Sequence, residues 1–507
     1  MRLWRDEKTA GIPMDAVTRV RDMRVRVHDF DWDATPLGSR RTWSPSLAWC
    51  VDLILSSGFP MSVRWGPDLI VIYNDAYAGL LGDRHPSALG KPLREVWPEI
   101  YSELGPLNEA ILRGERDSFF AKDHLWLIHR YGVPEEAHFT ISYSPISDTS
   151  GNKLGGMDVK FILEDDQAKP DTGVTKAKKL VLNDQVQMFV GGVLASTGYA
   201  LAPVSTEMKT VYIASIPAAD DLTQRQADKF PYLIRTGWSS SQPHHPLGQW
   251  ACEQGYKKII AVGADYAFGY ESVGGFQKAF EDCGGKIVQK IWPPLGTKDF
   301  GPFIPTIKAD ADAVFTLMVG PMALQFPKQL RAAGYKKPIV GGGTSYDEFA
   351  LPFMGHEVVG DVSALQYSAA ITTPKNEAFV KKYRAKYGKV PSYFSESNYT
   401  TAQLIDETIK KAGGKWPGAD QFVKIMAGLK IDAVRGAVSF DDLRNPVQDI
   451  YIKKVEKKVM FGYDKPELWN TVIKTYPSVG QFWTYGKDKF LAQPVYSRDF
   501  PPCKFCE

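Results

Sequence analysis

The segment Leu194-Ala-Ser-Thr197 places two hydroxyl side chains where a predicted strand gives way to a predicted helix. A carboxylate is best held by clustered hydrogen-bond donors, such as the free N–H groups of a helix start and nearby hydroxyls. In open parallel sheets, ligands bind outside the carboxyl ends of the strands. We therefore expect Ser196 and Thr197 to anchor a carboxylate, although the same residues also suit an ordinary helix cap. Ser215, just beyond the next predicted strand, is a further ligand-binding candidate.

An alternation of strands and helices from residue 158 onward predicts the elements that position these side chains. Strands are predicted at 159–163, 188–190, 210–213, 258–262, 286–291, 313–317 and 338–340. Helices are predicted at 172–182, 199–208, 246–254, 271–282 and 322–333. This order is typical of parallel sheets covered by helices on both faces. Because the alternation restarts after Arg235, we expect two α/β lobes.

Catalytic chemistry is not indicated by any residue pattern in the sequence. Asp165 and Asp166 form an acidic pair at the end of a predicted strand, which is more typical of a solvated turn than of an acid–base dyad. We find no nucleophile–base pair, no metal-ligand spacing and no phosphate-binding glycine loop. The sequence therefore predicts a protein that is not an enzyme, with no catalytic residues, no cofactor and no metal site.

The five cysteines are too few, and odd in number, for a disulfide scaffold. Cys252 and Cys283 lie near the ends of two predicted helices that flank one strand, and they would pair only in an oxidising compartment. Cys503-Lys-Phe-Cys506 has no second cysteine pair for a zinc site and does not begin a helix, as a thioredoxin-like site would. We expect the last segment to be a reduced, exposed tail.

Length and charge limit the class of protein. A chain of 507 residues predicts several compact units, and a net charge of +3 gives no sign of nucleic-acid binding. The first ten residues are charged throughout and resemble no secretory signal. No stretch reaches the roughly 18 apolar residues of a membrane-spanning helix. The expected location is therefore the cytoplasm, with no direct membrane insertion.

The first 150 residues predict a different, mixed fold. A helix is expected at 47–55, strands at 61–65 and 69–73, and a helix at 76–81 that Asn74 caps. Segments 123–129 and 137–143 flank a turn and predict a long antiparallel hairpin. The expected class is an α+β domain with an antiparallel sheet.

Several blocks in this region occur in the order of a known sensor module. They are Asp31-Trp-Asp-Ala-Thr-Pro-Leu-Gly38, Trp65-Gly-Pro-Asp-Leu69, Tyr73-Asn-Asp-Ala-Tyr77, His85-Pro-Ser-Ala-Leu-Gly90, Glu95-Val-Trp-Pro-Glu99 and Phe139-Thr-Ile-Ser-Tyr-Ser-Pro-Ile146. Residues 30–148 thus resemble the N-terminal PAS domain of bacterial sensor histidine kinases. The resemblance implies a five-stranded antiparallel sheet with helices on one face. No phospho-accepting helix or ATP lid follows in the sequence, so no kinase activity is expected.

The remainder of the chain carries a second series of blocks. They include Glu164-Asp-Asp-Gln-Ala-Lys-Pro170, Val190-Gly-Gly-Val-Leu-Ala-Ser-Thr197, Asp265-Tyr-Ala-Phe-Gly269, Gln329-Leu-Arg-Ala-Ala-Gly334 and Asn398-Tyr-Thr400. From residue 157 to about 499 the chain resembles the periplasmic solute-binding proteins of branched-chain amino acid ABC importers. The resemblance implies the type I fold, in which two α/β lobes enclose a ligand cleft. It also implies three crossovers between the lobes, near 235–239, 366 and 435–440.

The positions that match the ammonium-binding residues of this family are not acidic. They are Ala218, Ser239 or Ser241, and Thr344. A buried ammonium without a carboxylate partner would lose a charge-assisted hydrogen bond of ~1.5–3 kcal/mol. We therefore expect a carboxylate ligand without an α-ammonium group.

Flat apolar and sulfur-containing candidates complete the predicted site and suit an aromatic ring. They are Trp238, Tyr266, Phe268, Met318 and Tyr346. The blocks Trp292-Pro-Pro-Leu-Gly-Thr297, Ser392-Tyr-Phe-Ser395 and Gln481-Phe-Trp-Thr-Tyr485 resemble the branch of the family that takes up aromatic acids. The resemblance implies a benzoate or cinnamate derivative.

Residues 151–157 join the two regions, and the strand predicted to follow them matches a strand of either fold. The family's opening strand, loop and first helix are absent ahead of residue 157, and the PAS region lacks its last strand. Only 155–163 is available to complete either sheet. We expect it to complete one sheet alone, as the second strand of the first lobe, because the motif match to the lobe is stronger.

The predicted organisation is a leader (1–30), a PAS-like sensor domain (31–150) and a solute-binding domain (157–507). The first lobe would comprise about 157–236 and 367–435, and the second about 237–366 and 436–490. The expected function is binding of a small carboxylate, an aromatic acid rather than a branched-chain amino acid, as part of an ABC importer whose permease would be the partner. Two alternatives remain: a cytoplasmic small-molecule sensor, and an inactive fusion of truncated genes.

Overall fold

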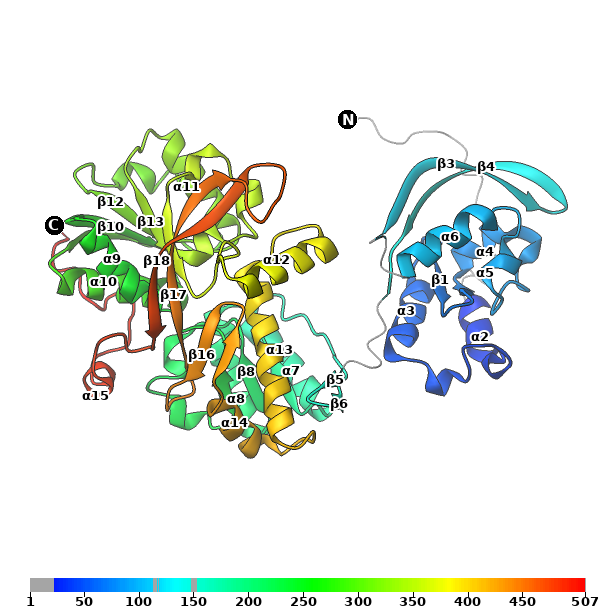
Figure 1. Cartoon of the computed structure of the whole chain (residues 1–507), viewed down its shortest axis with the longest axis horizontal. Coiled ribbons are helices and arrows are strands. Elements are labelled where there is room, and N and C mark those ends of the chain that lie inside the picture. The colour runs from blue at the N-terminus through cyan, green and yellow to red at the C-terminus, as the bar shows by residue number, and fades with distance from the viewer. Residues whose placement is uncertain (1–21, 113–115, 117, 147–152, 507) are drawn as a thin grey trace. The chain divides into compact units, whose positions relative to one another are not determined.

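The computed structural model describes residues 22–112, 116, 118–146 and 153–506 (Figure 1). Contacts within the chain divide them into two compact units. The first holds the described residues up to Lys153 together with Asp158–Phe161, and the second holds Leu154–Met157 and the described residues from Ile162 onward. The expected leader lies outside the described residues as far as residue 21. Its last part forms a short helix whose residues Met23 and Val27 are fully buried in the core of the first unit.

The first unit is an α+β fold whose strands are all antiparallel. Its helices are α2 (Asp22–Asp29), α3 (Pro45–Ser56), α4 (Asp75–Leu81), α5 (Leu93–Val96) and α6 (Tyr101–Leu112). Strand β1 (Ser62–Trp65) pairs with β2 (Ile70–Tyr73), and β3 (Phe119–Arg130) pairs with β4 (Val133–Tyr143) in a long hairpin. The predicted elements of this region are therefore confirmed, with boundaries that shift by a few residues (Figure 1).

Asn74 joins the strand β2 to the helix α4, as its position predicts. Its Oδ1 atom accepts hydrogen bonds from the backbone N–H groups of Tyr77 and Met61, each at 3.0 Å. Its Nδ2 atom donates to the carbonyl oxygens of Ile54 and Phe59, at 3.0 and 2.7 Å. The side chain is 1% exposed, so these bonds satisfy a polar group that burial would otherwise penalise.

The expectation of a five-stranded sheet in the first unit is wrong for the described residues. They form two separate two-stranded sheets, β1–β2 and β3–β4. Residues 147–152 lie outside the described part of the chain. Beyond them, β5 (Lys153–Leu154) and β6 (Met157–Asp158) pair only with each other. The segment that would supply a fifth strand thus turns back on itself at Gly155 and Gly156, both of which have positive φ.

The first lobe of the second unit contains a three-stranded parallel sheet. Its strands are β7 (Met188–Val190), β8 (Val211–Ala214) and β9 (Leu233–Arg235). Tyr212 of β8 packs with residues of α7 (Pro170–Leu182) and α8 (Ala195–Glu207), whereas Val211 and Ile213 pack with α13 (Tyr393–Lys411) and α14 (Ala419–Ala427). Because helices cover both faces, all four residues of β8 are buried.

A nine-stranded mixed sheet runs through the second lobe and extends to the first, where Ile431 and Phe440 of its end strands pack against the cluster of Val211 and Ile213 (Figure 1). Its parallel part is β11 (Lys286–Ile291), β10 (Lys258–Gly263), β12 (Ala313–Leu317), β13 (Ile339–Gly342) and β14 (Val362–Leu365). Its antiparallel part is β17 (Pro446–Lys458), β16 (Gly436–Phe440), β15 (Ile431–Ala433) and β18 (Glu467–Val479). The helices of this lobe and of the chain that follows are α9 (His244–Glu253), α10 (Ala267–Asp282), α11 (Pro321–Ala332), α12 (Pro374–Tyr387) and α15 (Lys487–Leu491).

The prediction that 159–163 forms the second strand of the first lobe is wrong. This segment pairs with no strand of the described residues, so it completes neither sheet. Phe161 and Leu163 are consequently 63% and 97% exposed.

The disulfide pairing of the cysteines differs in part from the prediction. Cys252 and Cys283, whose pairing the sequence leaves open, form a disulfide, and so do Cys503 and Cys506. The expected reduced state of the last segment is wrong, whereas its exposure is confirmed at residues 502 and 504–506. Cys503 packs against the main core of the second unit, and the side chain of Gln277 donates to the carbonyl oxygen of Pro502 at 2.9 Å. The tail is held on the second lobe by contacts far apart in sequence, which local sequence could not indicate.

Candidate functional site

The carboxyl ends of the first-lobe strands form one wall of the candidate site. Ser196 and Thr197 lie in the first turn of α8, Ser215 and Ala218 follow β8, and Trp238 and Ser239 follow β9. The segments after β8 and β9 touch directly, because the backbone N–H and the hydroxyl of Ser240 both donate to the carbonyl oxygen of Ala218 at 2.7 Å. We call these segments and the start of α8 the first-lobe wall.

The first-lobe wall contains buried polar atoms that have no hydrogen-bond partner among the described residues. They include Thr197 Oγ1, Ser215 Oγ, Trp238 Nε1 and Ser239 Oγ. Each of these four residues is at most 2% exposed. Buried polar groups in folded proteins are normally satisfied, and an unsatisfied one costs about 1–3 kcal/mol. Ser196, which is half-buried, is the least enclosed of the predicted anchors.

Arg235, at the end of β9, holds the first-lobe wall in place. Its guanidinium group is fully buried and donates to the carbonyl oxygens of Pro217 (2.7 Å), Trp238 (3.0 Å) and Ala219. It therefore ties the segment after β8 to the segment after β9. The sequence marked Arg235 only as a point where the chain crosses between lobes.

Most of the aromatic and sulfur-containing residues predicted for the site belong to the second lobe. Tyr266 and Phe268 lie at the start of α10, and their ring centroids are 6.1 Å apart. Phe268 shares one buried cluster with Ala218 and Trp238, so the lobes are in contact here. Met318 follows β12 and its carbonyl oxygen accepts from the hydroxyl of Thr344 at 3.5 Å.

Tyr346 lies with Met318 in a different buried cluster from Ala218, Trp238 and Phe268. Its ring is fully buried in the core of the second lobe, and its hydroxyl donates to Asp361 Oδ2 at 3.0 Å. Asp361 also pairs with Arg331 at 2.7 Å. The structure thus places Tyr346 in a buried polar pair behind the wall, and this orientation has no signal in the sequence.

Two buried carboxyl groups lie beside the site although the positions matched to the family are not acidic. Asp347 and Glu348 are 3% and 5% exposed and follow Thr344 by three and four residues. Asp347 Oδ1 accepts from the backbone N–H of Tyr393 at 3.2 Å, and the Tyr393 ring lies 5.0 Å from that of Trp238, edge to face. Two buried acids thus lie a few residues beyond Thr344, at positions that were not matched to the ammonium-binding residues of the family. Two adjacent acidic residues soon after the predicted strand 338–340 were the sequence feature that could have indicated this acid pair.

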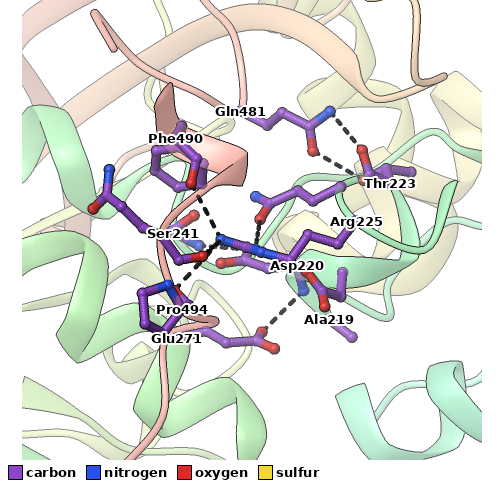
Figure 2. A network of polar contacts seen from close by, with 12 residues as sticks. Ala219, Asp220, Thr223, Arg225, Ser241, Glu271, Gln481, Phe490 and Pro494 are labelled. Atoms are coloured by element: carbon purple, nitrogen blue, oxygen red, sulfur yellow. Dashed lines mark hydrogen bonds and ion pairs between the residues drawn. The ribbon is translucent and has the colours of Figure 1, made fainter. Parts of the chain in front are cut away.

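A polar network joins the two lobes next to the first-lobe wall (Figure 2). Glu271 of α10 accepts from the hydroxyl of Tyr199 at 2.8 Å and from the backbone N–H of Asp220 at 3.0 Å. Asp220 Oδ1 in turn accepts from the backbone N–H of Ser241 at 3.0 Å. Glu271 belongs to the second lobe, and Tyr199 and Asp220 belong to the first. This network therefore joins the two lobes directly.

The same network reaches the C-terminal segment. Arg225 pairs with Asp221 at 3.0 Å and donates to the carbonyl oxygens of Phe490 (3.2 Å) and Pro494 (3.4 Å) (Figure 2). The hydroxyl of Thr223 donates to the side-chain oxygen of Gln481 at 3.1 Å. The chain after β18 is thereby fastened to the loop that follows β8.

Burial changes the proton affinity of several groups in this region. Burial raises the pKa of Asp220 to about 6, and burial with the nearby charge of Asp220 raises the pKa of Glu271. Burial and the charge of Glu348 raise the pKa of Asp347 to about 8. Burial lowers the pKa of His244 to about 4 and that of His245 to about 3.

These shifts predict that the second unit is more stable at pH 6.5 than at pH 8. Folded Asp347 keeps its proton up to about pH 8, whereas an unfolded aspartate releases it near pH 4, so stability falls as pH rises between these values. The buried histidines act in the opposite sense only below about pH 6.5, where the unfolded chain binds their protons. One proton corresponds to about 1.4 kcal/mol per pH unit. Urea unfolding of the full chain at both pH values measures the difference.

Asp347→Asn provides the control for this pH dependence. The variant should lose part of the difference between pH 6.5 and 8, with Glu271 supplying the rest. If the variant keeps the full difference, Asp347 does not hold its proton in the folded chain.

Comparison with known proteins agrees with this architecture. A family model described as "Periplasmic binding protein" matches residues 148–459, more than half of the chain, and one described as "PAS fold" matches 63–157. The chain therefore belongs to the periplasmic binding protein family and also contains a PAS domain. The two matches overlap at residues 148–157, the region that both folds claim in the sequence.

Curated relatives and solved structures belong to the same class. The "Leu/Ile/Val-binding protein homolog 6" of Brucella melitensis is 30% identical over 339 residues, which cover 65% of this chain and 84% of the relative. A solute binding protein of an ABC transporter from Rhodopseudomonas palustris BisB5, in complex with 3,4-dihydroxy benzoic acid, is 32% identical with a TM-score of 0.61 and covers 65% of this chain and 90% of that one. One from R. palustris in complex with benzoate is 26% identical, with a TM-score of 0.58 and coverages of 65% and 90%.

The fold of the second unit is thus the two-lobed type I fold of substrate-binding proteins of ABC transporters. Among the described residues, no helix combines the length and apolar content needed to cross a bilayer.

Proposed function

We propose that the second unit binds a small aromatic carboxylate between its lobes, as the solute-binding component of an ABC importer. The observation that carries the proposal is the set of unpartnered buried donors in the first-lobe wall, at the carboxyl ends of parallel strands. Trp238 Nε1 is a donor only, so its partner must be an acceptor. Three hydroxyls and the start of α8 lie beside it, which together suit a carboxylate.

The aromatic part of the ligand is supported by the rings around these donors. Trp238, Phe268 and Tyr393 share one buried cluster, and Tyr266 packs against it. Flat rings prefer to pack against other rings edge to face or offset. Two related solute-binding proteins are described in complex with benzoate and 3,4-dihydroxy benzoic acid, which supports this ligand class.

Calorimetry on the full chain tests the proposal, with benzoate, 4-hydroxybenzoate and leucine as ligands. We expect both aromatic acids to bind. Trp238→Phe should weaken their binding by about ten- to a hundredfold, because a hydrogen bond to a charged acceptor contributes ~1.5–3 kcal/mol. Trp416→Phe, in a separate cluster of the first lobe, is the matched control. Binding of leucine without binding of either benzoate would contradict the proposal.

The PAS domain in the same chain favours a second candidate, a sensor that responds to the same ligand. On this reading, ligand binding would alter the association of the chain with itself or with a signalling partner. Analytical ultracentrifugation of the full chain with and without 4-hydroxybenzoate separates the two functions. If 4-hydroxybenzoate changes the sedimentation coefficient no more than closure of the lobes would, the result favours the importer component.

A further inference from the structure

The buried pair Asp347 and Glu348 has one oxygen left over. Asp347 Oδ1 accepts from the N–H of Tyr393 at 3.2 Å, and Asp347 Oδ2 accepts from the N–H of Phe349 at 3.0 Å. Glu348 Oε1 accepts from the N–H of Ala369 at 3.0 Å. Glu348 Oε2 is buried and has no partner among the described residues. A buried carboxylate oxygen without a donor is costly, so a donor from a ligand would satisfy it.

Glu348, which carries this unpartnered oxygen, is next in sequence to a residue that contacts the aromatic side chains of the site. The Tyr393 ring lies 5.0 Å from the Trp238 ring, and the backbone N–H of Tyr393 binds Asp347, the neighbour of Glu348. The unpartnered donors Trp238 Nε1 and Ser215 Oγ belong to the first lobe, whereas Glu348 belongs to the second. The second unit therefore offers unpartnered donors in one lobe and an unpartnered acceptor in the other.

The charges around the acid pair disfavour a cationic ligand group. Lys453 is fully buried, donates to the carbonyl oxygen of Tyr367 at 3.2 Å, and lies close enough to Asp347 to oppose the rise in its pKa. Lys453 thus already places a buried positive charge beside the acid pair. A second buried cation there would meet its repulsion, whereas a hydroxyl donates a hydrogen bond without adding charge.

We propose that Glu348 accepts a hydrogen bond from a ring hydroxyl of the ligand, while the carboxylate of the ligand binds the donors at Ser215 and Trp238. The inference rests on the proposed function and narrows its ligand class from aromatic carboxylates to hydroxylated aromatic carboxylates. Glu348 would then determine specificity by discriminating the hydroxylated ring from the unsubstituted one. A site built around a hydrogen bond to a ligand rejects the analogue that lacks the group.

Calorimetry on the full chain at pH 7 compares 4-hydroxybenzoate with benzoate. We expect the hydroxylated acid to bind at least about tenfold more tightly to the wild-type chain. Glu348→Gln, which keeps the size and a neutral acceptor, should reduce this ratio several-fold. Glu348→Met should bring the ratio close to one while benzoate binding persists, which also shows that the variant is folded. Glu377→Gln, a partly exposed acid on α12, should leave the ratio unchanged.

Three outcomes would overturn the inference, and they can be told apart. Equal binding of the two benzoates to the wild-type chain, or a ratio that neither Glu348 variant alters, would refute the role of Glu348 but leave the proposed function standing. Binding of leucine that Glu348→Gln abolishes would assign the acid pair to an ammonium group. Failure of every aromatic acid to bind the wild-type chain would refute the proposed function, and the inference with it. If Glu348→Met does not fold, the ratio of the affinities of Glu348→Gln for 4-hydroxybenzoate and benzoate tests the role of Glu348.

Discussion

Arg235→Met is expected to lower the free energy of unfolding of the second unit by about 3–5 kcal/mol. The fully buried guanidinium donates to the carbonyl oxygens of Pro217, Ala219 and Trp238, and a methionine would leave these buried acceptors without that donor. It would also remove a positive charge that interacts with the buried acids Asp220 and Glu271. Urea unfolding of the full chain, followed by tryptophan fluorescence, measures the loss.

Arg498→Met is the matched control for this substitution. The Arg498 side chain is 57% exposed and lies 3.7 Å from Asp265, and exposed pairs of this kind contribute ~0–1 kcal/mol. A loss of similar size in both variants would show that Arg235 has no special role in holding the first-lobe wall. Because the arginine is a positioning residue, Arg235→Met should also weaken binding of 4-hydroxybenzoate, through displacement of the wall.

Gly237→Ala is expected to reduce ligand binding by about a hundredfold or more. A Cβ atom at Gly237 would lie 2.4 Å from the carbonyl oxygen of Ser215, a backbone atom that cannot turn aside. The segments after β8 and β9 would therefore have to separate, and a misplacement of about 1 Å in positioned groups typically costs two orders of magnitude in function. Calorimetry with 4-hydroxybenzoate measures the effect.

Gly480→Ala provides the comparison, because a Cβ atom there meets nothing within 4 Å. This variant should bind the ligand as the wild-type chain does. Wild-type affinity in Gly237→Ala would mean that the segments carrying Ser215 and Trp238 tolerate separation. The first-lobe wall would then not be the anion site, and the carboxylate would have to bind elsewhere in the cleft.

Much of the fold could be predicted because it depends on local patterns. The alternation of apolar runs with helix-capping and turn residues located most helices and strands between residues 45 and 342 within a few residues, as for β10, β11 and β12, whereas the elements after β13 were not predicted. The same reasoning placed Thr197 near the start of a helix and Ser215 just after a strand, which is where they lie. Asn74 was assigned as a helix cap on its residue type and position alone, and it caps α4.

The site itself depended on contacts that no local pattern contains. Tyr346 carries the aromatic character expected of a ligand contact, yet it faces Asp361 in the core. Glu271 and Tyr199 meet across 72 positions of sequence, and Arg235 spans two loops that only the folded sheet brings together. Asp347 and Glu348 are acidic residues of a kind usually exposed, and only packing buries them.

The sequence by itself determined the identity of the two folds, the class of each element and the chemistry that the wall residues carry, because these follow from side-chain type and spacing. Only the tertiary structure decided which strands pair, which polar atoms remain unsatisfied and which acids are buried. Residues 159–163 illustrate the reason: the segment has the composition of a strand, but a strand exists only where a neighbour supplies the other half of its hydrogen bonds.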